Sequence, residues 1–173
     1  MIQIGFVPEA DLPELQATAQ NYQKLWHEFG SSIVESAKKI TGLDFASQKI
    51  VATIHNGHSQ SHPLMLQATT NRQRSRGDLV HELMHILLVD NNIHSSVVDD
   101  NNHGRAVHKL LDLVLFDIYV EVYGRTFARD QVALEKSQNQ DYEEAWEWAL
   151  NKNFTQRQKM FEKYKLESNS NKS

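Results

Sequence analysis

The sequence predicts an α+β protein that is mostly helical, with a small sheet of two or three strands preceding its central helix. Three observations predict this class. Apolar residues recur at helical spacing near the start of the chain, two short strand-like runs follow, and several further helical segments come after them. At 173 residues the chain is long enough for one well-cored domain and short for two.

The first helix is expected over 13–40, where leucine and aromatic side chains recur every three or four residues. Two strands are expected next, at 49–55 and 63–70. An Asn-Gly turn signal at 56–57 predicts that these strands form a hairpin or a pair of adjacent strands.

Helices are then expected over 75–90 and 103–123, with the polar segment 91–102 as a loop between them. Ser75 and Asp78 have the spacing of a capping box at the start of the first of these helices. Three more helices are expected, at 126–137, 141–151 and 154–166. We therefore expect a single domain over 1–166 and a disordered tail over 167–173.

Composition excludes several kinds of site. The chain has no cysteine, so disulfides, a thiolate nucleophile and cysteine-ligated zinc are ruled out, and any metal must be bound by His, Asp or Glu. A formal charge of −4 argues against a broadly basic surface for nucleic acid. No apolar run reaches the roughly 18 residues that span a bilayer, and no secretory signal is evident, so we expect a cytoplasmic protein without a membrane partner. The oligomeric state is left open.

The motif HELMH occupies residues 81–85. In a helix, His81 and His85 project about 40° apart and lie one turn of about 5.4 Å from each other, so both imidazoles can reach one metal ion. Glu82 lies about 100° round the helix from His81, where it can reach a water molecule at the metal. This is the H-E-x-x-H arrangement, with the glutamate as general base.

The neighbours of this motif favour a metal over a chance match. A histidine on a helix is more often a satisfied core or surface residue than a ligand. Here apolar side chains occupy nearly every direction around the helix, and three ionisable groups in such a helix cost several kcal/mol unless they are paired or bound to metal. A Zn²⁺ ion satisfies all three, so we expect zinc as the cofactor.

The stretch VHELMH resembles the active-site helix of zincin metallopeptidases. The resemblance implies a zinc metallopeptidase, a hydrolase that cleaves peptide bonds of a peptide or protein substrate through a metal-bound water, with Glu82 as general base. It also implies that substrate lies extended along an edge strand, for which 64–70 is the candidate. The alternative is a catalytically silent zincin-fold protein that binds metal or a regulatory partner.

Catalytic zinc usually has three protein ligands. The candidates for the third are His94, His103, His108, Asp117 and Glu121. The stretch from HELMH to NNHG resembles SprT-like metallopeptidases, in which a His-Gly pair opens the next helix, and this resemblance implies His103. The chain lacks their aromatic residue after His-Gly and their cysteine ribbon. The rival is a gluzincin-like arrangement with Glu121 or Asp117 as ligand, and His103 and Glu121 cannot both bind because about 27 Å of helix separates them.

Weaker signals accompany the motif. His55, His58 and His62 lie close together in the sequence, in a segment that is more simply a solvated loop. Three arginines between 72 and 76 are candidate contacts for a peptide carboxylate or nucleic acid, although such positions at a helix start are usually solvated. Three tyrosines are candidate oxyanion donors, with core packing as the simpler interpretation: Tyr119, Tyr123 and Tyr142.

Overall fold

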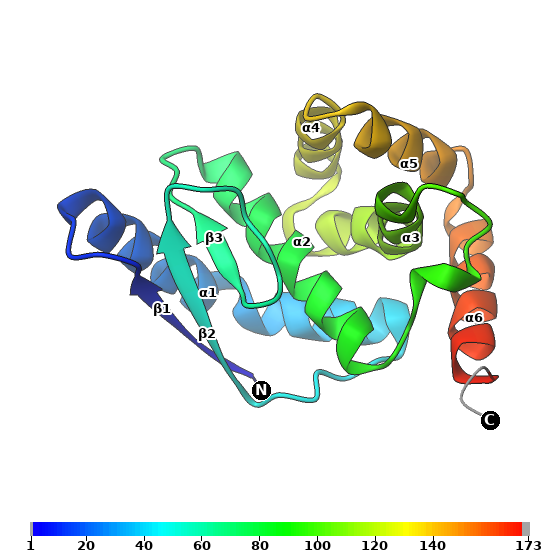
Figure 1. Cartoon of the computed structure of the whole chain (residues 1–173), viewed down its shortest axis with the longest axis horizontal. Helices are drawn as coiled ribbons and strands as arrows, with labels where there is room; N and C mark the ends of the chain where they lie inside the picture. The colour runs from blue at the N-terminus through cyan, green and yellow to red at the C-terminus, as the bar shows by residue number, and fades with distance from the viewer. Residues whose placement is uncertain (1, 171–173) are drawn as a thin grey trace.

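The computed structural model describes residues 2–170, which form three strands, six α-helices and one short 3-10 turn (Figure 1). In chain order the elements are β1 (Gln3–Pro8), α1 (Pro13–Thr41), β2 (Lys49–His55), β3 (Met65–Gln67), α2 (Arg72–Asp90), η1 (Ser95–Val97), α3 (His103–Tyr123), α4 (Arg125–Lys136), α5 (Gln140–Leu150) and α6 (Phe154–Ser170). This arrangement confirms the expected α+β class, helical in the main with a small sheet.

The sheet is parallel throughout, in the order β1-β2-β3. The two predicted strands are adjacent, as expected, but the hairpin alternative is wrong. The chain reverses after β2, and Gln60 then pairs antiparallel with Met65, so a second reversal before β3 restores the original direction. β1, which was not predicted as a separate element, pairs with β2 through the crossover formed by α1.

α1 confirms the predicted first helix and runs unbroken through Gly30. A Cβ atom at Gly30 would lie 2.8 Å from the Trp26 ring, so the glycine lets this indole pack directly against the helix backbone. The helix ends at Gly42, whose φ of 69° lies in the left-handed region that glycine adopts without a steric penalty.

α2 begins at Arg72, earlier than the predicted start at 75. Its N-cap is Asn71, whose side-chain oxygen accepts a hydrogen bond from the backbone N–H of Arg74 at 3.1 Å. Ser75 therefore lies inside the first turn, and the Ser75 and Asp78 pair does not form the predicted capping box. Along most of its length α2 is buried on several sides, which fits its apolar sequence.

α3 lies at the centre of the helical half and packs against α1, α2, α4, α5 and α6 (Figure 1). It begins at the predicted His103, with Asn102 as N-cap, and ends before Gly124. Because α3 contacts both the motif helix α2 and the later helices, it brings residues from distant parts of the sequence to one site.

α6 continues to Ser170, beyond the predicted end at 166. Ser168 is buried, and its hydroxyl accepts a hydrogen bond from the backbone N–H of His94 at 3.1 Å, which ties the last turn to the loop after α2. The first residues of the expected disordered tail are thus helical, and residues 171–173 lie outside the described part of the chain. Among the described helices, none is long and apolar enough to cross a membrane.

Candidate metal centre

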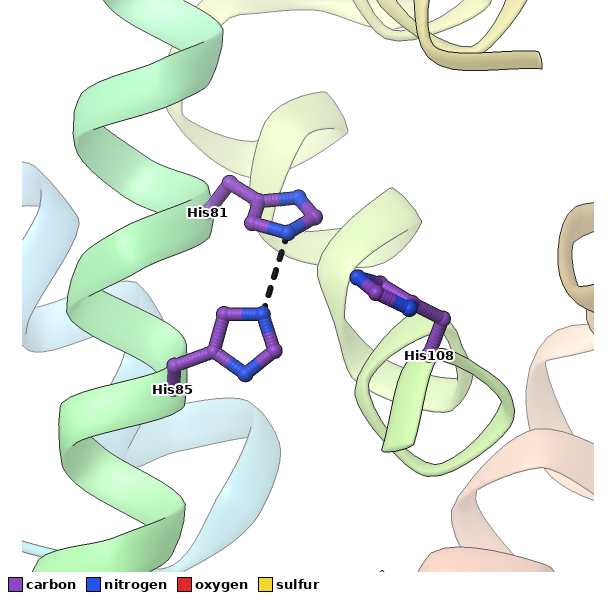
Figure 2. Close-up of side chains that lie close together, drawn as sticks. All are labelled: His81, His85 and His108. Atoms are coloured by element: carbon purple, nitrogen blue, oxygen red, sulfur yellow. Dashed lines mark hydrogen bonds between the residues drawn. The ribbon is translucent and has the colours of Figure 1, made fainter. Parts of the chain in front are cut away.

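Three histidines converge between α2 and α3: His81 and His85 from α2, and His108 from α3 (Figure 2). One nitrogen from each ring lies within 4.8 Å of the other two. The Nε2 atoms of His81 and His85 are 3.1 Å apart. Tetrahedral zinc with bonds of about 2.0–2.1 Å would separate its ligand nitrogens by roughly 3.3 Å. The pair therefore already has the spacing of two ligands on one ion.

His108, and not His103, lies beside the histidine pair. His103 is the first residue of α3 and is exposed, outside the cluster. His108 shares with Asp112 and Tyr119 the face of α3 that carries the centre, because these residues recur at helical spacing. This spacing can be read from the sequence, but it identifies His108 as a ligand only when the face of α3 that is turned toward α2 is known.

The carboxylates of the gluzincin-like alternative lie elsewhere. Asp117 forms an ion pair with Arg157 at 2.7 Å, and Glu121 forms one with Lys39 at 2.6 Å. Both acids line a separate cavity of about 890 Å³ bounded by α1, α3, α4 and α6. Each has the salt-bridged surroundings expected of a structural helix face.

Glu135 on α4 contacts the ring nitrogen of His81 that faces away from His85. Its Oε2 atom lies 3.5 Å from Nδ1 of His81, and the carboxylate is almost fully buried. It also accepts hydrogen bonds from the Tyr119 hydroxyl at 2.8 Å, the Gln131 amide at 2.9 Å and the Trp146 indole N–H at 3.0 Å. A carboxylate at Nδ1 fixes the ring orientation and leaves Nε2 for the metal. The sequence analysis missed Glu135, which looks like an ordinary residue of an amphipathic helix.

His108 is held in a comparable way. Its Nδ1 donates to the backbone carbonyl of Gly104 at 2.8 Å, which leaves Nε2 as the free nitrogen of the ring. The ring also packs against Tyr142 of α5, with the ring centroids 4.1 Å apart. Two of the three imidazoles are therefore oriented by hydrogen bonds on the side away from the centre.

The charges of the three imidazoles differ. Burial would lower the pKa of His81, but the charge and hydrogen bond of Glu135, followed by the charge of Glu82, raise it to about 9. Burial, followed by the positive charge of His81, lowers the pKa of His85 well below its ordinary value and that of His108 to about 4. Without a metal, a cationic His81 is thus favoured between neighbouring carboxylates, and the other two imidazoles keep their lone pairs. Metal binding would require His81 to release its Nε2 proton.

Asp112 provides a test of whether a metal fits. It is fully buried, and neither carboxylate oxygen has a hydrogen-bond partner in the described part of the chain. Burial, followed by the charge of Glu135, raises the pKa of Asp112 well above its ordinary value, while His81 lowers it. A dication held by three histidines would compensate both carboxylates, and three imidazoles are a typical ligand set for catalytic zinc. The residues present fit a zinc ion.

Glu82 faces a polar cleft of about 430 Å³ next to the histidines. α2 and residues 58–59 form one side of the cleft, and the junction of α4 with α5 forms the other. Burial raises the pKa of Glu82, opposed by His81 and reinforced by Asp78 and Glu135, to about 7. No donor in residues 2–170 forms a hydrogen bond to Glu82, so its carboxylate is available to a ligand in the cleft.

The segment after β2 closes the strand edge that was expected to bind substrate. The N–H and C=O of Met65 both pair with Gln60, at 2.8 and 2.9 Å. The N–H of Gln67 donates to the Ser59 hydroxyl at 3.0 Å, and its C=O accepts from the Tyr22 hydroxyl at 3.2 Å. The outward backbone groups of β3 are therefore occupied by the chain itself, which contradicts the expectation of an open edge at 64–70.

The three histidines of this segment do not form a second metal cluster within residues 2–170. His58 lines the cleft, and the backbone carbonyl of His58 lies 3.0 Å from Nε2 of His55.

In comparisons with known proteins, the chain matches no protein-family profile, and neither the curated proteins nor the solved structures include a significant match. Its function is therefore inferred from the geometry and chemistry of this site.

Proposed function

We propose that this protein is a zinc-dependent metallopeptidase with a zincin-like core, in which His81, His85 and His108 bind the metal and Glu82 is the general base. The convergence of three imidazole nitrogens within 4.8 Å carries this proposal. The cleft that begins at His81 and Glu82 gives a substrate access to the same place. The order of elements also supports it, since a small sheet precedes the HExxH helix and the third histidine lies on the next helix.

Zinc bound at this centre would acidify a water molecule and polarise the carbonyl of the scissile bond. Glu82 is placed to take a proton from the attacking water and to pass it to the leaving nitrogen. A carboxyl group with a pKa of about 7 exchanges protons effectively near neutral pH. Glu135 and the Gly104 carbonyl hold two of the imidazoles so that the ligand nitrogens keep their directions.

Tyr142 is the tyrosine best placed to donate a hydrogen bond to the developing oxyanion. It lines the cleft beside His81 and Glu82, and its ring packs on His108. Burial, followed by the charge of Glu135, raises its pKa, so the hydroxyl keeps its proton at neutral pH. Tyr119, by contrast, already donates to Glu135, and Tyr123 packs against Phe127 away from the cleft.

The test is a comparison of the wild-type protein with Glu82→Gln, measuring bound zinc by elemental analysis and hydrolysis of a mixed peptide library by mass spectrometry. We expect stoichiometric zinc in both proteins and a loss of about 10²- to 10⁴-fold in hydrolysis for the variant, because the general base is gone. Glu121→Gln, which alters an exposed acid on the far side of α3, serves as the control.

Undiminished hydrolysis by Glu82→Gln would contradict the mechanism in which Glu82 is the general base. Wild-type protein that holds zinc but cleaves nothing would support the alternative of a catalytically silent metal-binding protein. Wild-type protein that contains no zinc would contradict the proposal of a metal centre.

A further inference from the structure

One face of α2 connects the metal centre with the start of the helix. At about 100° per residue, Arg74 and His81 differ by only about 20° in direction, and about 10.5 Å of helix separates them. Asp78 and Glu82 project on the same side, and all four residues line the cleft. A molecule lying in the cleft therefore runs from Glu82 toward Arg74.

The guanidinium group of Arg74 has unused hydrogen-bond donors. Its Nε atom is buried and has no hydrogen-bond partner within the described residues. The nearest carboxylate oxygen, on Asp78, is 3.8 Å away and is bonded instead by the Ser59 hydroxyl at 2.9 Å. Two other buried or half-buried arginines differ: Arg105 and Arg157 each make two-pronged hydrogen bonds to an aspartate.

No other lysine or arginine lines the cleft in the described part of the chain. The neighbouring Arg76 packs its guanidinium over the rings of Phe29 and Tyr123, and Arg72 is exposed and lines a different hollow. Among the described residues, Arg74 is therefore the single lysine or arginine available to an anionic ligand there, and its charge, unlike that of a histidine, does not depend on pH or on metal binding. A planar guanidinium binds a carboxylate through two parallel hydrogen bonds.

We propose that Arg74 binds the free C-terminal carboxylate of a peptide substrate, so that the protein cleaves near the C-terminal end of peptides. This inference rests on the proposed hydrolytic function. An extended residue spans about 3.3–3.6 Å. Between Glu82 and the long side chain of Arg74 there is thus room for one or two residues after the scissile bond. The cleft, at about 430 Å³, suits a peptide end better than a folded protein surface.

The opposite wall of the cleft suits the same ligand. Gln138 and Asn139 line it. Gln138 offers an amide donor and acceptor to the peptide groups between the two ends, whereas Asn139 offers its amide donor, because its side-chain oxygen caps α5 by accepting from the N–H of Tyr142. Asp78, Glu82 and Glu135 also line the cleft, so acidic side chains on the terminal residues would be repelled. The specificity expected is for a terminal carboxylate that follows neutral or basic residues.

The test uses zinc-loaded full-length protein and two peptides that are identical except for a free or an amidated C-terminus. We expect wild-type kcat/KM to be about 10- to 100-fold higher for the free acid, mostly through KM, because a hydrogen-bonded charge pair is lost in the amide. Arg74→Gln should bring the ratio close to one, and Arg74→Lys should restore part of it. Arg72→Gln removes the same charge outside the cleft and should leave the ratio unchanged. A wild-type ratio near one, or an unchanged ratio in Arg74→Gln, would overturn the inference.

A binding measurement separates this inference from the proposed hydrolysis. Zinc-loaded Glu82→Gln is titrated calorimetrically with the same two peptides and with inorganic phosphate. If the free acid binds in a manner that depends on Arg74 but the wild-type protein cleaves nothing, the carboxylate site is supported and the proposed peptidase activity is contradicted. If the wild-type protein hydrolyses the acid and the amide at equal rates, the peptidase activity is supported and the carboxylate site is contradicted. Phosphate binding as tightly as the free-acid peptide would show a general anion site and overturn the assignment to a peptide terminus.

Discussion

The Nδ1 atom of His81 lies 3.5 Å from Oε2 of Glu135, a carboxylate that also accepts hydrogen bonds from Tyr119, Gln131 and Trp146. Residues of α3, α4 and α5 therefore converge on one carboxylate, which in turn contacts an imidazole of α2. The histidine centre is part of the packing between helices, and changes in that packing should alter its affinity for metal.

Glu135→Gln should weaken zinc binding by about 10- to 100-fold, because a neutral amide replaces the carboxylate that orients His81. It should also lower the free energy of unfolding by about 3 kcal/mol, since an amide NH₂ would replace one acceptor oxygen among four buried donors. Competition with a chelator and urea unfolding measure the two effects. Glu121→Gln, in an exposed ion pair, is the control for both. Zinc affinity equal to wild type would mean that His81 is oriented without Glu135.

The third ligand can be tested with two histidines of the same helix. His108→Ala should lose stoichiometric zinc after dialysis, because removal of a direct ligand costs more than the roughly 10- to 100-fold that loss of a supporting residue costs. His103→Ala should keep its zinc, because this residue is exposed at the start of α3 and outside the cluster. The reverse result would favour the SprT-like ligand arrangement, with His103, over the proposed one with His108.

Acid should destabilise the protein through Asp100, just before α3. Its carboxylate is nearly buried and accepts hydrogen bonds from Arg105, Lys109 and the N–H of Asn102. The bonds from Arg105 first, and from Lys109 next, hold the pKa of Asp100 well below its usual range. The folded-state pKa is thus below the unfolded value of about 3.9, so the stabilisation is complete above that value and decreases as the pH falls below it.

Asp100→Asn should therefore be less stable than wild type at pH 7, and the difference should shrink at pH 3. Urea unfolding at the two pH values measures it. An equal difference at both values would assign the effect to packing and not to the charge of Asp100.

The helices and the histidine pair could be predicted from local sequence. The apolar spacing of α1 and α3 determines which face of each is buried, and H-E-x-x-H places His81 and His85 together in any α-helix. The direction of β3 could not be predicted in this way, because the Asn-Gly signal marks one reversal and the second reversal depends on the pairing of Gln60 with Met65.

The remaining parts of the centre depend on tertiary packing. Whether His103 or His108 faces α2 is decided by the rotation of α3 about its axis, which contacts with five other helices determine. Glu135 and Arg74 gain their roles from their neighbours. Glu135 is surrounded by buried donors, whereas the Arg74 side chain has only a 3.8 Å ion pair with Asp78 and no hydrogen bond among the described residues. No motif in the sequence marks Glu135, and the three arginines at 72–76 are candidate carboxylate contacts in the sequence without Arg74 being distinguished from its neighbours.

The bonds that Gln60 and Ser59 make to β3 also affect how this molecule behaves among copies of itself. An open strand edge presents unpaired N–H and C=O groups, to which strands of other molecules can add at high concentration. The chain covers these groups on β3. At the opposite edge, β1 ends with Pro8, which has no N–H to donate. An added strand would thus find the outward backbone groups of β3 already bonded, and at β1 it would meet a proline at the last position of the strand.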